Sequence, residues 1–180
     1  MLGKHNTGLI VVDIQGRLAQ IVQHSDALIH NVKALIQGAQ ILELPIIWLE
    51  QTPHKLGETH PELCELLSRS SQPIEKFHFG AGKETAFVDA INRTGATNWL
   101  VCGIEAHICV YQTVCGLLAD GLHVEVVQDC VSSRAEANLA LGLHKMAQLG
   151  AHLTSVEMCL YELVEDCRAA EFKPILQLIK

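Results

Sequence analysis

The sequence has no run of Lys and Arg long enough to form a basic face, and its 180 residues carry a net charge of −7. This composition argues against a partner that is a nucleic acid or an anionic membrane surface. Residues 1–7 contain no apolar signal-peptide core, and no apolar run approaches membrane-spanning length. We therefore expect no nucleic-acid and no membrane partner, and a small molecule as the ligand.

Paired cysteine motifs are also missing. The seven cysteines form no C-x-x-C pair and no zinc-finger spacing. An odd number of cysteines, together with the missing signal, predicts reduced thiols and a cytoplasmic location. The chain has no Pro- or Gly-rich linker, no internal repeat and no low-complexity tract. With 49% hydrophobic and 18% charged residues, it is expected to fold as a single globular domain over residues 1–180.

Strand and helix patterns alternate along the chain. Buried-strand patterns occupy residues 8–13, 45–50, 73–76, 99–102, 122–127 and 151–154. Amphipathic helical stripes occupy residues 25–39, 83–93, 108–118 and 133–147, and two more helices follow at the C-terminal end. This order predicts an α/β fold, a three-layer α/β/α sandwich on a mostly parallel, six-stranded, Rossmann-like sheet. The alternation within 122–127 places that strand nearer an edge.

Local signals predict how several of these elements begin and end. Ser25 is a possible N-cap, and Ser133-Arg-Ala-Glu136 has the pattern of a capping box. Two prolines, a glycine and two histidines make residues 51–61 a loop. In the helix after the capping box, four side chains are expected to face the core: Leu139, Leu143, Met146 and Ala147.

Three reactive groups follow predicted strands directly. They are Asp13 after the first strand, Lys76 after the third and Cys109 after the fourth, where the strand passes into a helix. Ligands bind at the carboxyl ends of such strands. The start of a helix and a nearby ammonium favour a thiolate, and a carboxylate can accept the thiol proton. The three groups together suit acyl transfer through a thioester.

Each of these residues, taken singly, also fits a structural role. Asp13 could close a strand in an Asx-turn, Lys76 could be a solvated surface lysine, and Cys109 could be an inert buried cysteine. Position alone leaves both interpretations open.

Four segments of the sequence resemble the isochorismatase-like cysteine hydrolase family, which includes nicotinamidases and N-carbamoylsarcosine amidohydrolases. They are Val11-Val-Asp-Ile-Gln15 with its D-x-Q opening, Glu75-Lys76, Val101–Val110 with the pattern G-I-x-x-x-x-C, and Asp129–Ser133. The similarity runs from about Gly8 to Ser155. W-L-E-Q and G-I-E-A resemble the isochorismatase-domain-containing proteins most.

The resemblance implies a catalytic triad of Asp13, Lys76 and Cys109. It also implies a cis peptide bond between Ile104 and Glu105. That bond would turn the Glu105 N–H toward the same point as the Cys109 N–H, and the two would form an oxyanion hole. Isochorismatases proper, which cleave a vinyl ether, lack the cysteine. This chain keeps it, so thiol chemistry is expected.

Two departures from the family pattern affect the pocket. Several members carry a serine in the loop after the lysine, where this chain has Phe79-Gly-Ala-Gly82. Nicotinamidases bind a metal through an Asp-x-His…His cluster, and here His54 and His60 keep a compatible separation but Thr52 replaces the Asp. Two loop histidines without a carboxylate are more often surface residues than ligands. We expect no metal, no cofactor and no nicotinamidase activity.

Four further residues are candidates for contact with the substrate, with an exposed loop residue as the alternative for each: Gln15, Gln51, Phe79 and His107. Glu50 and Glu105 are expected to support the site from behind. The function expected is that of a cysteine hydrolase acting on a small amide or a related C–N or ester bond, in a homo-oligomer of two or more subunits. The alternatives are a non-catalytic oligomeric binding protein and a redox-sensing thiol protein.

Overall fold

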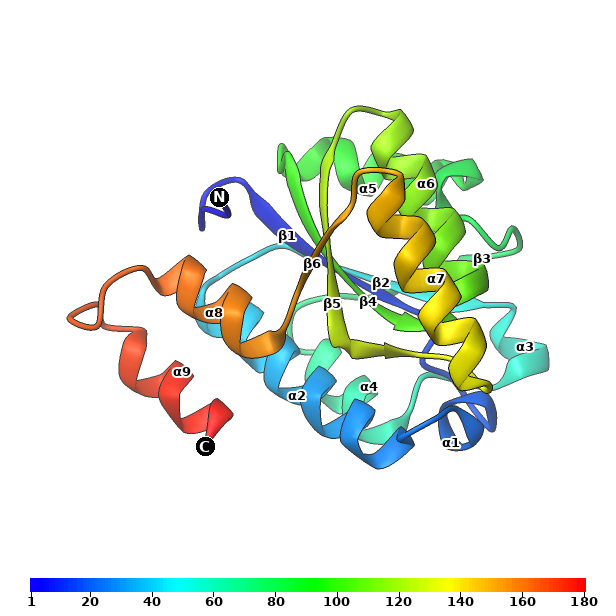
Figure 1. Cartoon of the computed structure of the whole chain (residues 1–180), viewed down its shortest axis with the longest axis horizontal. Coiled ribbons are helices and arrows are strands. Elements are labelled where there is room, and N and C mark those ends of the chain that lie inside the picture. Colours follow the sequence, from blue (N-terminus) through cyan, green and yellow to red (C-terminus); the bar gives the residue numbers. More distant parts are fainter.

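The computed structural model describes residues 1–180, and its strands form a single sheet (Figure 1). The strand order is β3-β2-β1-β4-β5-β6, and all five pairings are parallel. The strands are β1 (Thr7–Val12), β2 (Ile46–Gln51), β3 (Pro73–Lys76), β4 (Asn98–Ile104), β5 (His123–Ser132) and β6 (His152–Thr154). The predicted α/β sheet is confirmed, with every strand parallel.

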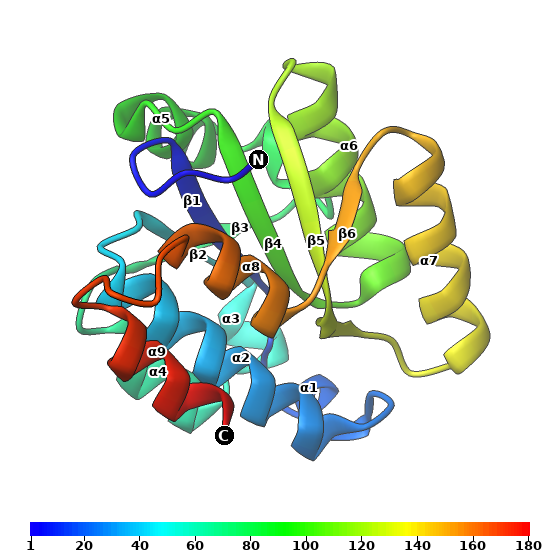
Figure 2. The ribbon, with the colours of Figure 1, turned by 60° about the vertical axis from the view of Figure 1, so that its left-hand side comes forward.

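Helices cover both faces of the sheet (Figures 1 and 2). One face packs against α2 (Ser25–Ile41), α4 (Pro61–Leu67), α8 (Val156–Val164) and α9 (Phe172–Ile179). The other packs against α5 (Thr85–Thr94), α6 (Tyr111–Ala119) and α7 (Glu136–Gln148). Alternate strand residues serve the two cores, with Leu9 and Val11 in one and Ile10 and Val12 in the other. The three-layer prediction is therefore correct. No helix is both long and apolar enough to cross a bilayer.

The strand order reverses between β1 and β4. The chain builds outward from β1 to β2 and β3, then returns to place β4 on the other side of β1. A crevice for ligands opens at such a reversal, outside the carboxyl ends of the strands. Four short helices lie around these ends: α1 (Leu18–Ile21), α3 (Pro53–Leu56), η1 (Ala81–Lys83) and η2 (Ala106–Val110).

Two predicted helix caps are wrong. Helix α2 begins at Ser25, but the Ser25 hydroxyl donates to the Ala19 carbonyl at 2.6 Å, and His24 precedes the helix in a left-handed conformation. Helix α7 begins at Glu136 without a side-chain cap. Ser133 cannot cap it because its hydroxyl is buried and lies 3.0 Å from Nδ1 of His107. The Ser25 hydroxyl thus bonds to the preceding turn, and the Ser133 hydroxyl makes a tertiary contact in place of the cap.

Other boundaries also differ from the prediction. Strand β5 extends beyond the predicted end at residue 127 to Ser132, and it lies near an edge as predicted, beside the edge strand β6. The predicted loop at 51–61 contains α3. On α7, Met146 is buried and Ala147 is exposed, because Gly142 and Met146 form the face toward the sheet.

Two glycines allow backbone segments to approach each other closely near the carboxyl ends of β1 and β4. Gly103 has φ +134°, and a Cβ there would lie 2.1 Å from the Val12 carbonyl oxygen. A Cβ on Gly142 would lie 3.1 Å from the backbone of Ala106, so α7 rests directly on η2. These contacts fix the segment that carries Cys109.

Candidate active site

A buried ion pair joins two strands that are not neighbours. Asp13 follows β1 with φ +52°, a conformation that an L-residue adopts rarely and that here turns the chain sharply away from the sheet. Lys76 is the last residue of β3 and is fully buried. Its Nζ lies 2.8 Å from Oδ2 of Asp13. Because β2 separates β1 from β3, the lysine side chain reaches across the end of β2.

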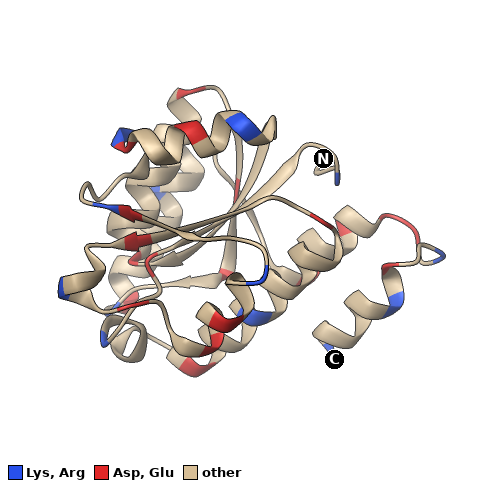
Figure 3. Ribbon diagram, turned by 180° about the vertical axis from the view of Figure 1, so that it is seen from behind, with Lys and Arg blue, Asp and Glu red and all other residues tan.

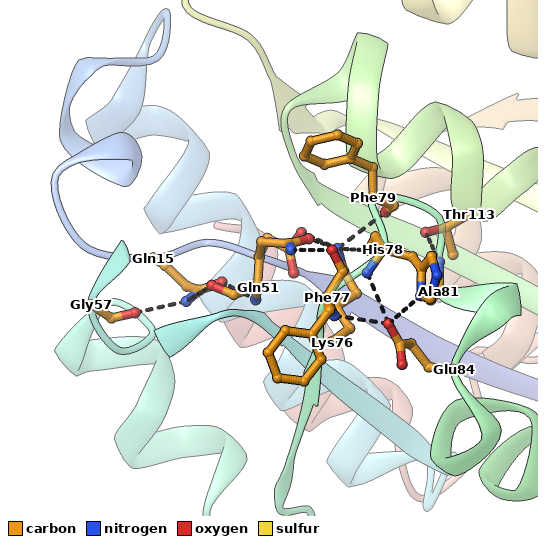
Figure 4. Close-up of polar contacts among 11 residues, drawn as sticks. Gln15, Gln51, Gly57, Lys76, Phe77, His78, Phe79, Ala81, Glu84 and Thr113 are labelled. Carbon is orange, nitrogen blue, oxygen red and sulfur yellow. Dashed lines mark hydrogen bonds and ion pairs between the residues drawn. The ribbon is translucent and has the colours of Figure 1, made fainter. Parts of the chain in front are cut away.

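Neutral oxygens surround the Lys76 ammonium. It donates to Oε1 of Gln51 at 2.6 Å and to the carbonyls of His78 and Phe79, each at 3.1 Å (Figure 4). An ammonium has three protons, so these acceptors can take all of them. The Lys76 ammonium therefore holds Asp13 chiefly through the attraction between their charges. The same ammonium fixes the loop after β3 through the His78 and Phe79 carbonyls.

The Asp13 carboxylate is buried without a well-aligned hydrogen-bond donor at either oxygen. Burial raises the pKa of this carboxyl above its ordinary value, and the positive charge of Lys76 opposes that rise. A carboxylate with spare acceptor capacity and a raised pKa is suited to taking up a proton.

Cys109 lies in η2, a five-residue π-helix that leads from the end of β4 into α6. Such π-helical turns occur frequently at functional sites. Burial, as the largest influence, and the Asp13 carboxylate together raise the pKa of the Cys109 thiol to about 12, against the opposing charge of Lys76. Burial and the neighbouring carboxylate therefore outweigh the ammonium and the helix start, which favour a thiolate.

A cavity of about 260 Å³ opens above these groups at the carboxyl ends of the strands. Asp13 and Cys109 line it, while Lys76 lies beneath its wall. The remaining lining residues are mainly apolar and come from several loops and helices: Gln15, Leu18, Gln51, Leu56, Phe79, Ile104, Glu105, Ile108 and Arg134. A larger hollow of about 740 Å³ between residues 77–83 and α6 contains neither Asp13 nor Cys109.

The two candidate glutamines line the cavity, but their amides bind the protein itself. Gln15 accepts from the Gln51 backbone N–H at 2.6 Å and donates to the Gly57 carbonyl at 2.7 Å (Figure 4). Gln51 donates from Nε2 to the Phe77 carbonyl at 2.9 Å while Oε1 accepts from Lys76. Both side chains therefore position loops and the lysine.

The other predicted residues take different places. Phe79 lines the cavity with 56% of its surface exposed. His107 does not line it, since its Nδ1 lies between Oγ of Ser133 at 3.0 Å and Oε2 of Glu105 at 3.3 Å. Glu50 accepts from the Thr59 N–H and hydroxyl, both at 2.7 Å, and fixes the loop after β2. The peptide bond between Ile104 and Glu105 is cis.

Sequence reasoning missed Arg134. It lies two residues beyond β5, lines the cavity, and pairs through Nε with Oε1 of Glu105. Its position after a strand, at the same edge as Asp13 and Cys109, was the available signal. The same residue also fits the predicted capping box Ser133-Arg-Ala-Glu136, which implies a purely structural role.

The two loop histidines do not converge. His54 lies on α3, where its Nδ1 is 3.4 Å from Oε1 of Glu75, and both side chains are exposed. His60 directly precedes α4. The structure contains no group of three His, Cys, Asp or Glu side chains arranged to hold a metal ion.

Comparison with known proteins gives a consistent result. The family model "Isochorismatase domain" matches residues 7–158. The secreted isochorismatase effector Isc1 of Phytophthora sojae is 34% identical, over 98% of this chain and 85% of its own. The MAR1 ribonuclease structure from Caenorhabditis elegans is 35% identical, with a TM-score of 0.91 over 99% of this chain and 91% of that one.

A second similar structure is the Escherichia coli YcaC gene product, described as an octameric hydrolase of unknown specificity. It is 25% identical, with a TM-score of 0.93 over 99% of this chain and 88% of that one. The match of the family model over most of the chain confirms the resemblance inferred from the sequence. This chain belongs to the isochorismatase-domain family.

Proposed function

We propose that the protein is a cysteine hydrolase that cleaves a small amide, or a related C–N or ester bond, through a thioester on Cys109. The observation that carries this proposal is the buried Asp13 carboxylate, which has no aligned donor and lies with Lys76 and the Cys109 thiol at one cavity. Separate structural roles would not require these three groups at one site.

In the first half-reaction, the Cys109 sulfur attacks the substrate carbonyl and its proton passes to Asp13. The negative charge thereby moves from the carboxylate to the sulfur and then to the carbonyl oxygen, and the Lys76 ammonium stays beside the site. The backbone N–H groups of Glu105 and Cys109 bind the oxyanion. Collapse of this adduct breaks the C–N bond, and Asp13 returns the proton to the leaving amine.

In the second half-reaction, Asp13 accepts a proton from water as that water attacks the thioester. The C–S bond breaks, the acid leaves, and the proton returns to the cysteine sulfur. Each step exchanges one proton between Asp13 and its neighbour, so the buried site never gains net charge. That neutrality suits a cavity where burial disfavours ionisation.

Trapping of the acyl-enzyme tests this mechanism. The protein is mixed with an activated ester such as p-nitrophenyl acetate and quenched in acid, and each cysteine is examined by mass spectrometry. One acetyl group on Cys109, absent in Cys109→Ala and present in Cys115→Ala, supports the proposal. The half-buried Cys115 lies outside the cavity and serves as the matched control. Acetylation of other cysteines without Cys109 contradicts the proposal.

The name of the nematode neighbour raises RNA cleavage as another activity. Lys and Arg are scattered along this chain and interspersed with Asp and Glu (Figure 3). Binding to RNA draws most of its affinity from basic surfaces. The charge distribution therefore supports a small-molecule substrate over RNA.

The redox-sensor alternative, the oligomeric state and the cellular location are supported to different degrees. A redox sensor needs an accessible thiolate, and the raised pKa of Cys109 disfavours that role. A homo-oligomer stays a prediction, which the octameric neighbour supports. The cytoplasmic location also stays a prediction, and one relative is named a secreted effector.

A further inference from the structure

The Glu105 backbone N–H donates to no backbone carbonyl, although Glu105 lines the catalytic cavity together with Cys109. The carbonyl of the same residue is occupied, since it accepts from the N–H groups of Ile108 at 3.0 Å and Val110 at 3.3 Å. The free N–H is the one assigned above to the oxyanion. Its direction therefore depends on how the rest of Glu105 is held.

His107 holds the Glu105 side chain from two positions further along the chain. Its Nδ1 lies 3.3 Å from Oε2 of Glu105 and 3.0 Å from Oγ of Ser133. An N–H at Nδ1 can be shared between these two oxygens, whereas a bare nitrogen would turn its lone pair toward the carboxylate. The imidazole is 19% exposed and both of its partners are buried, so little water competes for these contacts. The geometry favours the tautomer with its proton on Nδ1.

Ser133 is a fixed anchor for this histidine. It is fully buried, and its carbonyl accepts from the Gln23 N–H at 3.0 Å. The neighbouring Arg134 binds the other carboxylate oxygen of Glu105 through Nε. Ser133 and Arg134 follow β5, whereas Glu105 and His107 follow β4. The His107 imidazole therefore links the ends of two neighbouring strands.

His107 is not placed to exchange protons with the substrate. It does not line the cavity, and its Nδ1 faces Glu105 and Ser133. Asp13 already lines the cavity with spare acceptor capacity. The position of His107, on the segment between the two oxyanion donors, instead suits a residue that acts through Glu105.

We propose that His107 is a positioning residue, which donates from Nδ1 to the Glu105 carboxylate and thereby keeps the Glu105 N–H directed at the oxyanion. This inference rests on the hydrolase function proposed above. Without the imidazole, the Glu105 peptide is free to turn, and the oxyanion loses part of one donor. Reactions of Cys109 that form no oxyanion should be unaffected.

Two reactions of Cys109 separate these cases. Butyraldehyde adds reversibly: the sulfur bonds to the carbonyl carbon, the C=O π bond breaks with its electron pair on the oxygen, and the thiol proton passes to Asp13. Iodoacetamide alkylates the same sulfur by displacing iodide, the thiol proton leaves to solvent, and no oxyanion forms. Mass spectrometry of labelled Cys109 gives the alkylation rate. The butyraldehyde concentration that halves this rate gives the affinity of the adduct.

In His107→Ala, we expect the adduct affinity to fall about 10- to 100-fold, somewhat less than for loss of a complete donor, and the alkylation rate without aldehyde to stay within about twofold. His107→Asn should restore part of the affinity, because its amide nitrogen can donate in place of Nδ1. An unchanged adduct affinity in His107→Ala overturns the proposal. An equal fall in adduct affinity and alkylation rate also overturns it, since that result means a general disturbance of Cys109.

His123→Ala is the matched control. The His123 Nε2 lies 3.1 Å from Oε1 of Glu125, and the imidazole is 34% exposed. This residue begins β5 and therefore lies at the opposite end of the sheet from the cavity. We expect His123→Ala to leave the adduct affinity unchanged. A fall as large as that in His107→Ala would contradict a role specific to His107.

Acetylation by p-nitrophenyl acetate separates this inference from the proposed function. An adduct that depends on His107, in a protein whose Cys109 is never acetylated, refutes the hydrolase function and leaves the positioning role standing. Acetylation of Cys109 at the native rate in His107→Ala refutes the positioning role and leaves the hydrolase function standing. Absence of the butyraldehyde adduct in the native protein also refutes the positioning role.

Discussion

The ammonium of Lys76 lies 2.8 Å from the carboxylate of Asp13, although these residues end strands that are separated by β2. Both side chains are buried, so each charge depends on the other for compensation. The pair links the outermost strand β3 to the centre of the sheet. It also places a positive charge close to the cysteine without exposing that charge to solvent.

Replacing Lys76 by Met leaves a buried carboxylate without its counter-charge, and we expect a loss of about 3–5 kcal/mol in the free energy of unfolding near neutral pH. Burial alone then raises the pKa of Asp13 further above its unfolded value. A raised carboxyl pKa stabilises the fold at low pH and loses that contribution as the pH rises through it. The deficit in urea unfolding should therefore be larger at about pH 8 than at about pH 5.

The double variant Asp13→Asn/Lys76→Met supplies the control for this prediction. It removes both charges, so stability should recover toward the native value and the extra pH dependence should vanish. A deficit in Lys76→Met that is the same at both pH values would contradict the assignment to Asp13.

The ionisation of Cys109 gives a second prediction. With a pKa raised to about 12, Cys109 should be protonated near pH 8. The native protein and Cys109→Ala should therefore show the same thiolate absorbance at that pH. Replacing Asp13 by Asn removes a charge that raises the pKa and leaves Lys76 in place, so the Cys109 pKa should fall. Ultraviolet pH titrations of the native protein and Asp13→Asn measure the Cys109 pKa with and without the carboxylate. Cys109→Ala and the double variant Asp13→Asn/Cys109→Ala supply the matching backgrounds. A thiolate at neutral pH in the native protein would contradict the raised pKa.

The central strands and the three reactive residues of the candidate site could be predicted from the sequence. Apolar runs at 8–13 and 99–102 identified the central strands, and the rule that ligands bind at carboxyl ends drew attention to Asp13, Lys76 and Cys109. Local patterns failed where a distant residue competes for the same side chain. Ser133 contacts His107 instead of capping α7, and the Gln15 amide binds backbone groups of the 51–57 segment.

The protonation state of Cys109 could not be read from the chain either. The sequence shows the start of a helix and a lysine, which both favour a thiolate, but it does not show burial. In the structure, burial is the largest influence on this pKa. The position of Arg134 could not be predicted for a related reason, because its partner Glu105 lies 29 positions away along the chain.

Gln51 gives a third prediction, since it provides the shortest acceptor for the Lys76 ammonium, at 2.6 Å. Gln51→Leu leaves a buried ammonium one acceptor short and should lower the free energy of unfolding by about 1–3 kcal/mol. It should also reduce kcat more than it raises KM, because the lysine shifts relative to Asp13 while the cavity keeps its volume. Thermal unfolding and steady-state kinetics measure these effects. The exposed Gln112, replaced by Leu, is the control.

The packing of α7 against η2 gives a last prediction, which uses two helical glycines. A Cβ on Gly116, in α6, would meet its nearest atom, Cα of Gly82, at 3.7 Å, an ordinary contact. Gly116→Ala should therefore stabilise the protein by up to about 1 kcal/mol through helix propensity.

A Cβ on Gly142 would lie 3.1 Å from the Ala106 backbone and from Cα of His107. Gly142→Ala should lose that gain and push α7 away from η2. Since η2 carries Cys109, kcat should fall in Gly142→Ala and not in Gly116→Ala. Equal kinetics in the two variants would mean that η2 holds its position without α7.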